Sequence, residues 1–242
     1  MTLHIAMWSG PRNLSTAMMR SFGSRADTFV SDEPFYGCFL NATGADHPMR
    51  DDVIAAMDCD WGSVATSLRG PAPDGSAVWY QKHMWHHMTG PIGYDDFAGF
   101  AHAFLIRKPE RMIASYLRKR EAARFEDFGL ERQAEFFERE AERLGASPPV
   151  VDADDVLANP EAVLSKLCRS LGIAWDRSML TWATGRRDTD GPWAPHWYGA
   201  VESSTGFGPP ETRPVDLPAD ALRLAERCRP FYERLAQHRI SS

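Results

Sequence analysis

The loop that follows the first apolar run carries side chains suited to binding an anion. Residues 3–8 form a short apolar run, Ser9-Gly10-Pro11-Arg12 interrupts it, and a helical pattern follows. A helix that starts directly after such a turn presents unpaired backbone N–H groups and the positive end of its dipole. Arg12 adds a guanidinium that can bind two phosphate or sulfate oxygens, and Ser15 and Thr16 add hydroxyl donors. The sequence therefore predicts an oxyanion site at this loop.

The same loop departs from the motif of nucleotide triphosphatases. That motif, G-x-x-x-x-G-K-[ST], places a second glycine and a lysine around the phosphates. Here Gly10 is followed by Pro-Arg-Asn-Leu-Ser-Thr, so both are missing and hydrolysis of ATP or GTP is disfavoured. Because short motifs also arise by chance, an ordinary strand-to-helix turn with a surface arginine is the alternative interpretation of this loop alone.

Short apolar runs alternate with helical patterns along the chain. This alternation predicts an α/β fold of three layers, in which helices flank a central parallel sheet. The runs lack polar alternation, which is typical of strands buried on both faces. Asn159 and Pro160 suit the cap and the first turn of one helix. The predicted strands are residues 3–8, 28–31, 78–82, 103–107 and 150–152, and the predicted helices are residues 14–22, 110–119, 130–144, 160–171 and 219–238, the last interrupted at Pro230.

Polar segments follow four of these predicted strands. They comprise residues 9–16, Asp32–Glu33, residues 82–87 and residues 107–115. Ligands of parallel sheets bind at the carboxyl ends of the strands, and these ends lie at one edge of the sheet. We therefore expect the four segments to face a common site.

Composition and charge exclude several classes of protein. Among the 242 residues, 33 are acidic and 27 are basic, a balance that argues against a nucleic-acid partner. No apolar run approaches the roughly 20 residues of a membrane span, and no basic start precedes an apolar stretch as in a secretory signal. Cys38, Cys59, Cys168 and Cys228 are widely spaced, so we expect reduced thiols and a cytoplasmic protein. Residues 1–242 are expected to form a single domain.

Three segments, taken in order, resemble sulfotransferases. Gly10-Pro11-Arg12-Asn13-Leu14-Ser15-Thr16 is similar to the family's phosphosulfate-binding loop, whose forms are Pro-Lys-Ser-Gly-Thr-Thr and, in tyrosylprotein-type members, Pro-Arg-Ser-Gly-Thr-Thr. Arg107-Lys108-Pro109, followed by Ser115-Tyr116, matches the family's Arg-x-Pro and Ser-Tyr elements in spacing. Residues 154–172 resemble the family's E-D-L…P-E…L…F-L-G segment. The chain most resembles bacterial stand-alone sulfotransferase-like proteins.

The resemblance implies a P-loop-like fold and the donor 3′-phosphoadenosine 5′-phosphosulfate (PAPS), with no metal. In the family, the first loop binds the 5′-phosphosulfate, while the arginine and the serine of the second segment bind the 3′-phosphate. Residues 186–193 resemble an Arg-Lys-Gly-x-x-Gly-Asp-Trp element that closes over the 3′-phosphate and the adenine. The donor-binding residues implied are Gly10, Pro11, Arg12, Asn13, Leu14, Ser15, Thr16, Arg107, Ser115, Arg186 and Arg187.

The resemblance also offers two kinds of base for the acceptor hydroxyl. Tyrosylprotein-type members place a glutamate where Glu33 stands, and their loop arginine corresponds to Arg12. Cytosolic members instead end a strand with Lys-Thr-His, which aligns the lysine with Lys82 and the histidine with Met84. In that case a neighbouring histidine must substitute. We rank the candidate bases as Glu33, then His86, then His83, with Lys82 and Arg12 as charge stabilisers.

The aromatic segment of residues 186–198 admits three interpretations. It closes over the donor, as the resemblance implies; it forms an acceptor wall or lid; or it packs against the sheet. The function expected for the whole chain is PAPS-dependent transfer of a sulfuryl group to a hydroxyl of a small-molecule acceptor. The alternatives are a P-loop-type kinase or nucleotidase, and a non-catalytic nucleotide- or anion-binding protein of the same fold.

Overall fold

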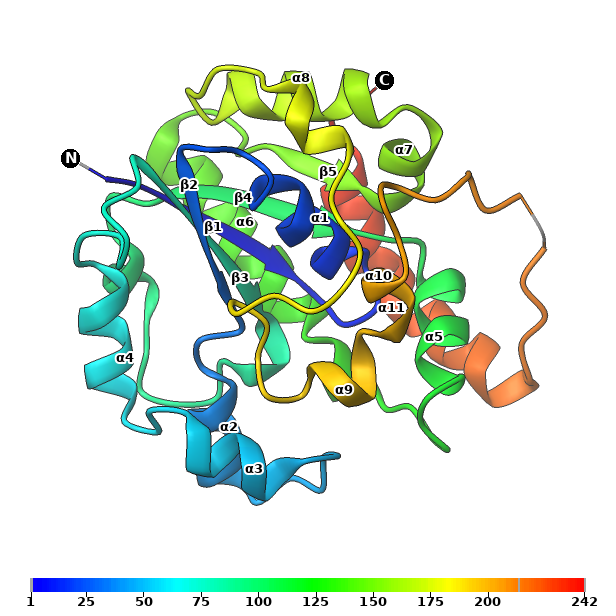
Figure 1. Cartoon of the computed structure of the whole chain (residues 1–242). Helices are drawn as coiled ribbons and strands as arrows, with labels where there is room; N and C mark the ends of the chain where they lie inside the picture. Colours follow the sequence, from blue (N-terminus) through cyan, green and yellow to red (C-terminus); the bar gives the residue numbers. More distant parts are fainter. Residues whose placement is uncertain (1, 213, 242) are drawn as a thin grey trace.

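A central sheet of five parallel strands organises the chain in a computed structural model that describes residues 2–212 and 214–241 (Figure 1). The strand order is β2-β3-β1-β4-β5, so β1 lies in the middle. Leu3 of β1 pairs with Val78 of β3, and this register continues to Ser9 and Met84 at the carboxyl edge. The strands are β1 (Leu3–Ser9), β2 (Thr28–Asp32), β3 (Val78–Met84), β4 (Ala101–Ile106) and β5 (Val150–Asp152).

Helices cover both faces of this sheet, so the three-layer α/β prediction is confirmed (Figure 1). Asn159 caps α8 as predicted, because its side chain accepts a hydrogen bond from the Ala162 N–H. The helices are α1 (Ser15–Phe22), α2 (Tyr36–Thr43), α3 (Arg50–Ala56), α4 (Trp61–Leu68), α5 (Pro109–Leu117), α6 (Leu130–Leu144), α7 (Ala153–Ala158), α8 (Pro160–Ser170), α9 (Ala194–Trp197), α10 (Gly199–Glu202) and α11 (Ala219–Ala236), with a 3-10 turn η1 (Trp85–His87) after β3.

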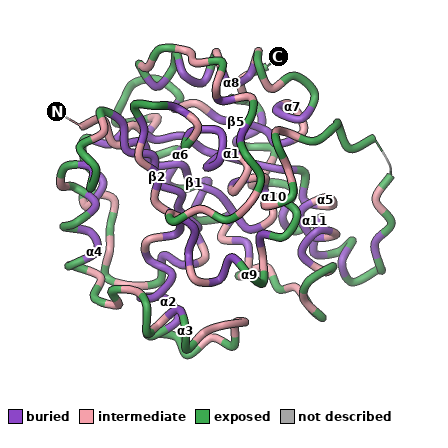
Figure 2. The backbone as a smooth tube through the Cα atoms, viewed as in Figure 1, coloured by how far each residue is buried: buried purple, intermediate pink, exposed green. Residues whose placement is uncertain are grey.

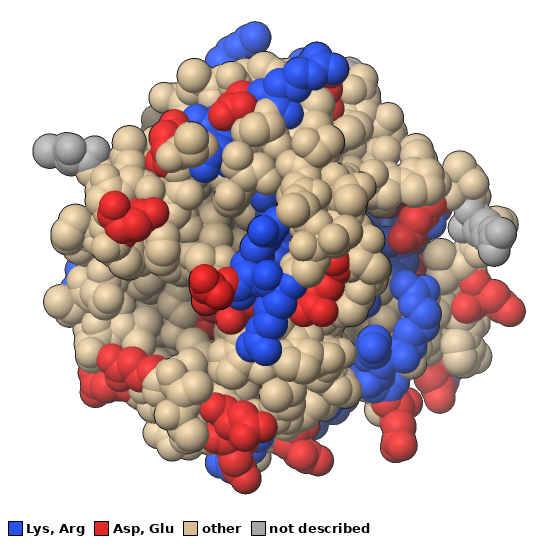
Figure 3. Space-filling view, viewed as in Figure 1, with Lys and Arg blue, Asp and Glu red and all other residues tan. Residues whose placement is uncertain are grey.

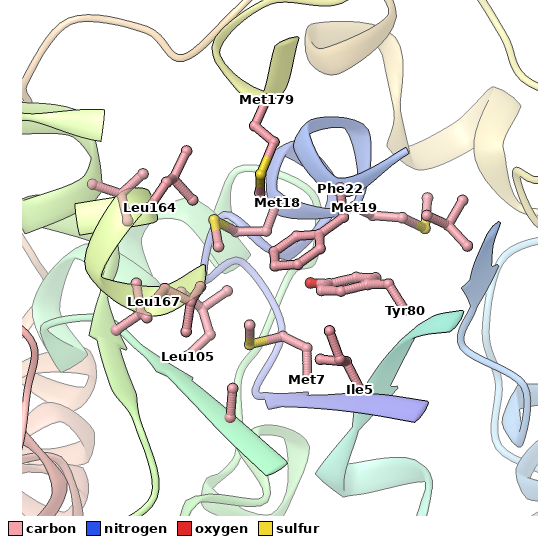
Figure 4. Packing of buried hydrophobic residues seen from close by; sticks show 14 of the residues in the cluster. Ile5, Met7, Met18, Met19, Phe22, Tyr80, Leu105, Leu164, Leu167 and Met179 are labelled. Atoms are coloured by element: carbon pink, nitrogen blue, oxygen red, sulfur yellow. The ribbon is translucent and has the colours of Figure 1, made fainter. Parts of the chain in front are cut away.

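Two apolar cores form because side chains of β1 alternate between the faces of the sheet. Ile5 and Met7 pack with α1 and α8 on one face, where the ring of Phe22 stacks on that of Tyr80 (Figure 4). Ala6 and Trp8 pack with α4 and α6 on the other face. The strands are therefore buried throughout the middle of the molecule (Figure 2), and side chains reach solvent mainly at the strand ends.

Most predicted boundaries lie within two residues of those in the structure, and two differences change how residues are placed. β3 continues past its predicted end at Lys82 to Met84, so His83 and Met84 belong to the strand and not to the loop after it. α11 runs from Ala219 to Ala236 without the predicted interruption at Pro230. A proline within a helix removes one hydrogen bond and costs about 3 kcal/mol. Apolar packing of this helix against α5 and the sheet core offsets that cost.

Candidate active site

A cavity of about 600 Å³ opens at the carboxyl edge of the sheet, where the sequence predicts ligand binding. Segments that follow β1, β2, β3 and β4 all contribute to its wall. The predicted site residues that line it are Pro11, Arg12, Leu14, Ser15, Thr16, Glu33, Lys82, His86, Arg107 and Ser115. Gly10, Asn13, His83, Arg186 and Arg187 are not among the lining residues.

The loop between β1 and α1 has a backbone shape suited to an anion. Arg12 and Leu14 have φ values of 63° and 71°, in the left-handed region that non-glycine residues rarely adopt. Leu14 stands where the sulfotransferase loop has glycine, so the chain keeps that conformation at the expense of strain. Successive N–H groups in turns of this kind can converge on an anion, and Ser15 then begins α1.

Gly10 and Asn13 support this loop from behind. A Cβ atom at Gly10 would lie 2.8 Å from the Phe128 carbonyl oxygen, so only glycine fits there without a shift. Asn13 is completely buried, and its side-chain amide donates to the carbonyl oxygen of Leu105 on β4 over 3.5 Å. These two residues therefore fix the path of the loop, whereas its other residues face the cavity.

A second cationic group lies beside the first, at the end of β4. The Arg107 Nη1 donates to the Arg12 carbonyl oxygen over 2.7 Å, and the Arg12 Nε donates to the Ser115 Oγ over 3.1 Å. Lys and Arg side chains gather over α5 on this side of the molecule (Figure 3). The Arg107 Nη2 also lies 2.6 Å from an oxygen of Glu211. Arg12, Arg107 and Ser115 thus form one connected donor surface.

Lys82 lies at the centre of a buried hydrogen-bond network. Its Nζ donates to Asp32 over 2.7 Å, to Glu33 over 2.5 Å and to the Tyr198 hydroxyl over 2.9 Å. The Tyr198 hydroxyl donates to Asp32 over 2.7 Å and accepts from the Trp193 indole N–H over 3.0 Å. Burial with two carboxylates keeps Lys82 charged, because a paired cation is far less costly to bury than a lone one. The ammonium is therefore held within this network.

Glu33 combines a strained backbone with a carboxylate suited to accepting a proton. Its φ is 43°, and its Oε2 lies 3.6 Å from the Nδ1 of His87. Burial raises the pKa of Glu33 to about 6, because desolvation and the Asp32 charge outweigh the attraction of Lys82. A carboxylate with this pKa is ionised at neutral pH and still has affinity for a proton, as a general base requires.

His83, His86 and His87 lie in different surroundings, and of the two ranked as bases only His86 lines the cavity. Lys82 and Met84 share one face of β3, and His83 points to the other face, where its ring stacks on Trp8 at 4.6 Å. His83 is therefore removed from the cavity and is not retained as a base. Burial lowers the pKa of His86 to about 3, so its imidazole is a weaker base than Glu33. His87 also faces the cavity and stacks on Tyr36.

The segment of residues 186–198 is attached to the body of the protein by buried contacts. Arg20 of α1 donates to Asp190 over 2.6 Å, and both side chains are almost inaccessible to water. Trp193, Trp197 and Tyr198 line the cavity. Arg186 is exposed and Arg187 donates to the Ala183 carbonyl oxygen, so neither reaches the cavity as the donor interpretation requires. The positions of the aromatic side chains favour the wall interpretation.

The profile of the family described as "Sulfotransferase domain" matches residues 3–239. The chain belongs to the sulfotransferase domain family. Two Arabidopsis thaliana proteins named branched-chain-amino-acid aminotransferase-like protein 1 and 2 are 37% and 35% identical over 235 residues, which is 97% of this chain. The chain spans only 42% and 41% of those relatives. The match therefore covers only one part of each of these two relatives.

Solved sulfotransferases have the same fold. The sulfotransferase domain of the Synechococcus PCC 7002 olefin synthase superimposes with a TM-score of 0.56 at 16% identity, covering 93% of this chain and 94% of that one. A sulfotransferase from Alicyclobacillus acidocaldarius gives 0.51 at 13% identity, covering 99% and 97%. At these identities the likeness concerns the fold, and the P-loop-like architecture expected from the resemblance agrees with it.

Several cavity residues of this sulfotransferase domain were not singled out from the sequence. Tyr36, His47 and Glu211 carried no sequence signal, because their place in the wall depends on contacts between distant segments. Tyr36 and His47 are joined by a hydrogen bond of 2.8 Å between the hydroxyl and Nδ1.

The described residues contain neither a metal cluster nor a membrane helix. In residues 2–212 and 214–241, no group of three or more His, Cys, Asp or Glu side chains is placed to hold a metal ion. Within the same residues, every helix is too short or too polar to cross a membrane. The four cysteines are free thiols, as expected from their spacing.

Proposed function

We propose that the chain transfers a sulfuryl group from PAPS to a hydroxyl of a small-molecule acceptor. The observation that carries the proposal is the pair of arginines, Arg12 and Arg107, which face one cavity together with the carboxylate of Glu33. PAPS has two separated anionic groups, and each arginine provides a site for one of them. A kinase or nucleotidase would need a cation around a triphosphate, and the loop has neither the second glycine nor the lysine.

The donor would lie across the ends of β1 and β4. The start of α1, with Arg12, Ser15 and Thr16, would bind the 5′-phosphosulfate through backbone N–H groups, a guanidinium and hydroxyls. Arg107 and Ser115, to which the resemblance assigns the 3′-phosphate, would bind it at the end of β4, where both contact Arg12. The Arg12–Ser115 hydrogen bond then sets the distance between the two anionic sites.

Glu33 would accept the proton as the acceptor hydroxyl attacks the sulfur atom. One S–O bond forms to the acceptor, the S–O bond to the 5′-phosphate breaks, and the proton passes to the Glu33 carboxylate. Lys82 would hold Glu33 in place and keep it ionised, since its ammonium already contacts two carboxylates. Arg12 would therefore provide most of the stabilising charge at the leaving phosphate. The acceptor would lie against Tyr36, His86, His87 and the aromatic wall.

A binding panel tests this function without knowledge of the acceptor. We expect 3′-phosphoadenosine 5′-phosphate (PAP), the product of the donor, to raise the unfolding temperature of the protein, because a ligand of the native state stabilises it by mass action. ADP, ATP and 5′-AMP should raise it much less. A larger shift with ATP than with PAP would instead support the kinase or nucleotidase interpretation.

Arg107→Ala is expected to weaken PAP binding by about 10- to 100-fold, the scale of a hydrogen bond to a charged group. Binding of 5′-AMP should change much less, because this nucleotide lacks the 3′-phosphate. Isothermal titration calorimetry of both nucleotides measures the two effects, and Arg177→Ala, at an exposed arginine outside the cavity, is the control. Equal losses for PAP and 5′-AMP would contradict the assignment of Arg107 to the 3′-phosphate.

Chelation of metals by EDTA is expected to leave PAPS turnover unchanged. Arg12 and the start of α1 provide the positive charge that magnesium provides in phosphoryl transfer. Turnover is measured as PAP release in the presence of a panel of phenols, sugars and hydroxy acids. If EDTA abolishes activity and one divalent ion restores it, a metal-dependent reaction has to replace the proposed one.

A further inference from the structure

The carboxylate of Glu211 lies between two arginines at the place proposed for the 3′-phosphate. Its Oε1 is 2.6 Å from the Arg107 Nη2, and its Oε2 accepts from the Arg111 Nη1 over 3.2 Å. The Glu211 side chain is 44% exposed, whereas that of Arg107 is 8% exposed and that of Arg111 is 16% exposed. A partly exposed carboxylate therefore reaches in to two arginines that are held by the body of the protein.

Arg107 has more hydrogen-bond capacity than this carboxylate uses. Its Nη1 donates to the Arg12 carbonyl oxygen and its Nη2 contacts Glu211, but its Nε is buried and has no partner among the described residues. A buried donor without a partner is costly. A phosphate monoester offers three oxygens and more negative charge than a carboxylate, so it can satisfy a donor that Glu211 leaves unpaired.

Arg111 lies in the first turn of α5, and Arg107 precedes that helix, directly after β4. Both guanidiniums form ion pairs with the same carboxylate, that of Glu211. The Arg111 Nε lies 3.4 Å from the Asp154 Oδ2, which directs the guanidinium toward Arg107. Arg111 is not among the residues that line the cavity, but it binds Glu211, which is, and it carries no role implied by the sequence motifs. Among the described residues, its ion pairs are with Asp154 and Glu211.

We infer that Arg111 is a further ligand of the donor's 3′-phosphate, and that Glu211 is an internal counter-ion which this phosphate displaces. The inference rests on the proposed function, because it assumes that PAPS is the donor. It adds a specificity-determining residue to the site: Arg107 and Arg111 together distinguish a nucleotide that carries a 3′-phosphate from one that does not. Glu211 lowers the affinity for the 3′-phosphate by competing for the same two arginines.

Titrations of PAP and of 5′-AMP into the wild type, Arg111→Ala, Glu211→Gln and the double variant test the inference. Arg111→Ala is expected to reduce the preference for PAP over 5′-AMP by about 10-fold or more. Glu211→Gln is expected to strengthen PAP binding by about 3- to 10-fold, because a neutral amide competes less well for the arginines. In the Arg111→Ala background, that gain should become smaller.

Control variants at an ion pair outside the cavity accompany these titrations, and two results would contradict the inference. Arg177→Ala and Glu161→Gln alter an exposed arginine–glutamate pair outside the cavity and should leave both affinities unchanged. If PAP binds the wild type but Arg111→Ala keeps the wild-type preference, or Glu211→Gln weakens PAP, the inference is wrong while the proposed function stands. If the wild type binds PAP no better than 5′-AMP, the proposed function itself fails.

Discussion

Replacement of Glu33 by glutamine is expected to lower kcat by about 10²- to 10⁴-fold, the usual contribution of a general base. Glutamine keeps the shape of the side chain, and its carbonyl oxygen can still accept from Lys82. What it loses is the ability to take the proton of the acceptor hydroxyl. Binding of PAP should remain close to the wild-type value, because Arg12 and Arg107 are untouched. Steady-state kinetics with an acceptor from the screening panel gives kcat, and calorimetry gives PAP affinity.

The pH profile gives this variant a second signature. Burial raises the pKa of Glu33 to about 6, so the carboxylate is ionised above that pH and protonated below it. The wild-type kcat/KM is therefore expected to fall as pH decreases through about 6, since a protonated carboxyl cannot act as a base. In Glu33→Gln this acid limb should disappear.

His86→Ala is the decisive comparison for Glu33. Burial lowers the pKa of His86 to about 3, so its loss should affect kcat much less than the loss of Glu33. Unfolding temperatures of both variants show whether the fold is intact. If His86→Ala abolishes turnover with normal PAP binding, and Glu33→Gln stays near the wild-type rate, then the histidine is the base and the tyrosylprotein-like mechanism is wrong for this chain.

All five predicted strands are present, and most of them differ from the prediction by one or two residues at an end. β3 was expected to end at Lys82, yet it continues through His83 to Met84. Lys82 is neutralised by carboxylates from β2 and its following turn, and His83 stacks on Trp8 of β1. The residues that pair with Lys82 and stack on His83 lie about 50 or more positions earlier in the sequence. The local sequence pattern around β3 therefore cannot show that a charged or polar side chain is buried in this strand.

Convergence of the site was predictable because it follows from the topology of the sheet. Arg12 and Arg107 are 95 residues apart, yet both follow parallel strands that end at one edge of the sheet. The Arg107 side chain donates a hydrogen bond to the backbone carbonyl oxygen of Arg12. The contacts of Tyr198 and Glu211 follow no such rule. They come from segments after the last strand, whose path is set by packing and ion pairs. The order of the strands therefore predicts that Arg12, Arg107 and Ser115 come together, whereas the rest of the cavity wall depends on tertiary contacts.

Asp190→Ala is expected to reduce the free energy of unfolding by about 3–5 kcal/mol, the cost of leaving one member of a buried ion pair without its partner. Arg20 donates to Asp190 over 2.6 Å, and the two side chains are 3% and 0% exposed. Asp190 also accepts from the backbone N–H of Arg187 over 2.8 Å. The variant leaves the Arg20 charge buried and loosens the segment that carries Tyr198. Urea unfolding followed by circular dichroism measures the loss, which is a large share of the usual 5–15 kcal/mol.

The same segment provides a matched control two residues away. Asp188 has the same charge and a similar sequence environment, but it is exposed, so Asp188→Ala should change stability by no more than about 0.5 kcal/mol. The double variant Arg20→Met with Asp190→Leu removes both charges and should recover much of the loss, since apolar residues of similar size often replace a buried pair well. If Asp190→Ala costs no more than Asp188→Ala, this ion pair does not hold the segment. If the double variant is no more stable than Asp190→Ala, packing and not the uncompensated charge of Arg20 accounts for the loss.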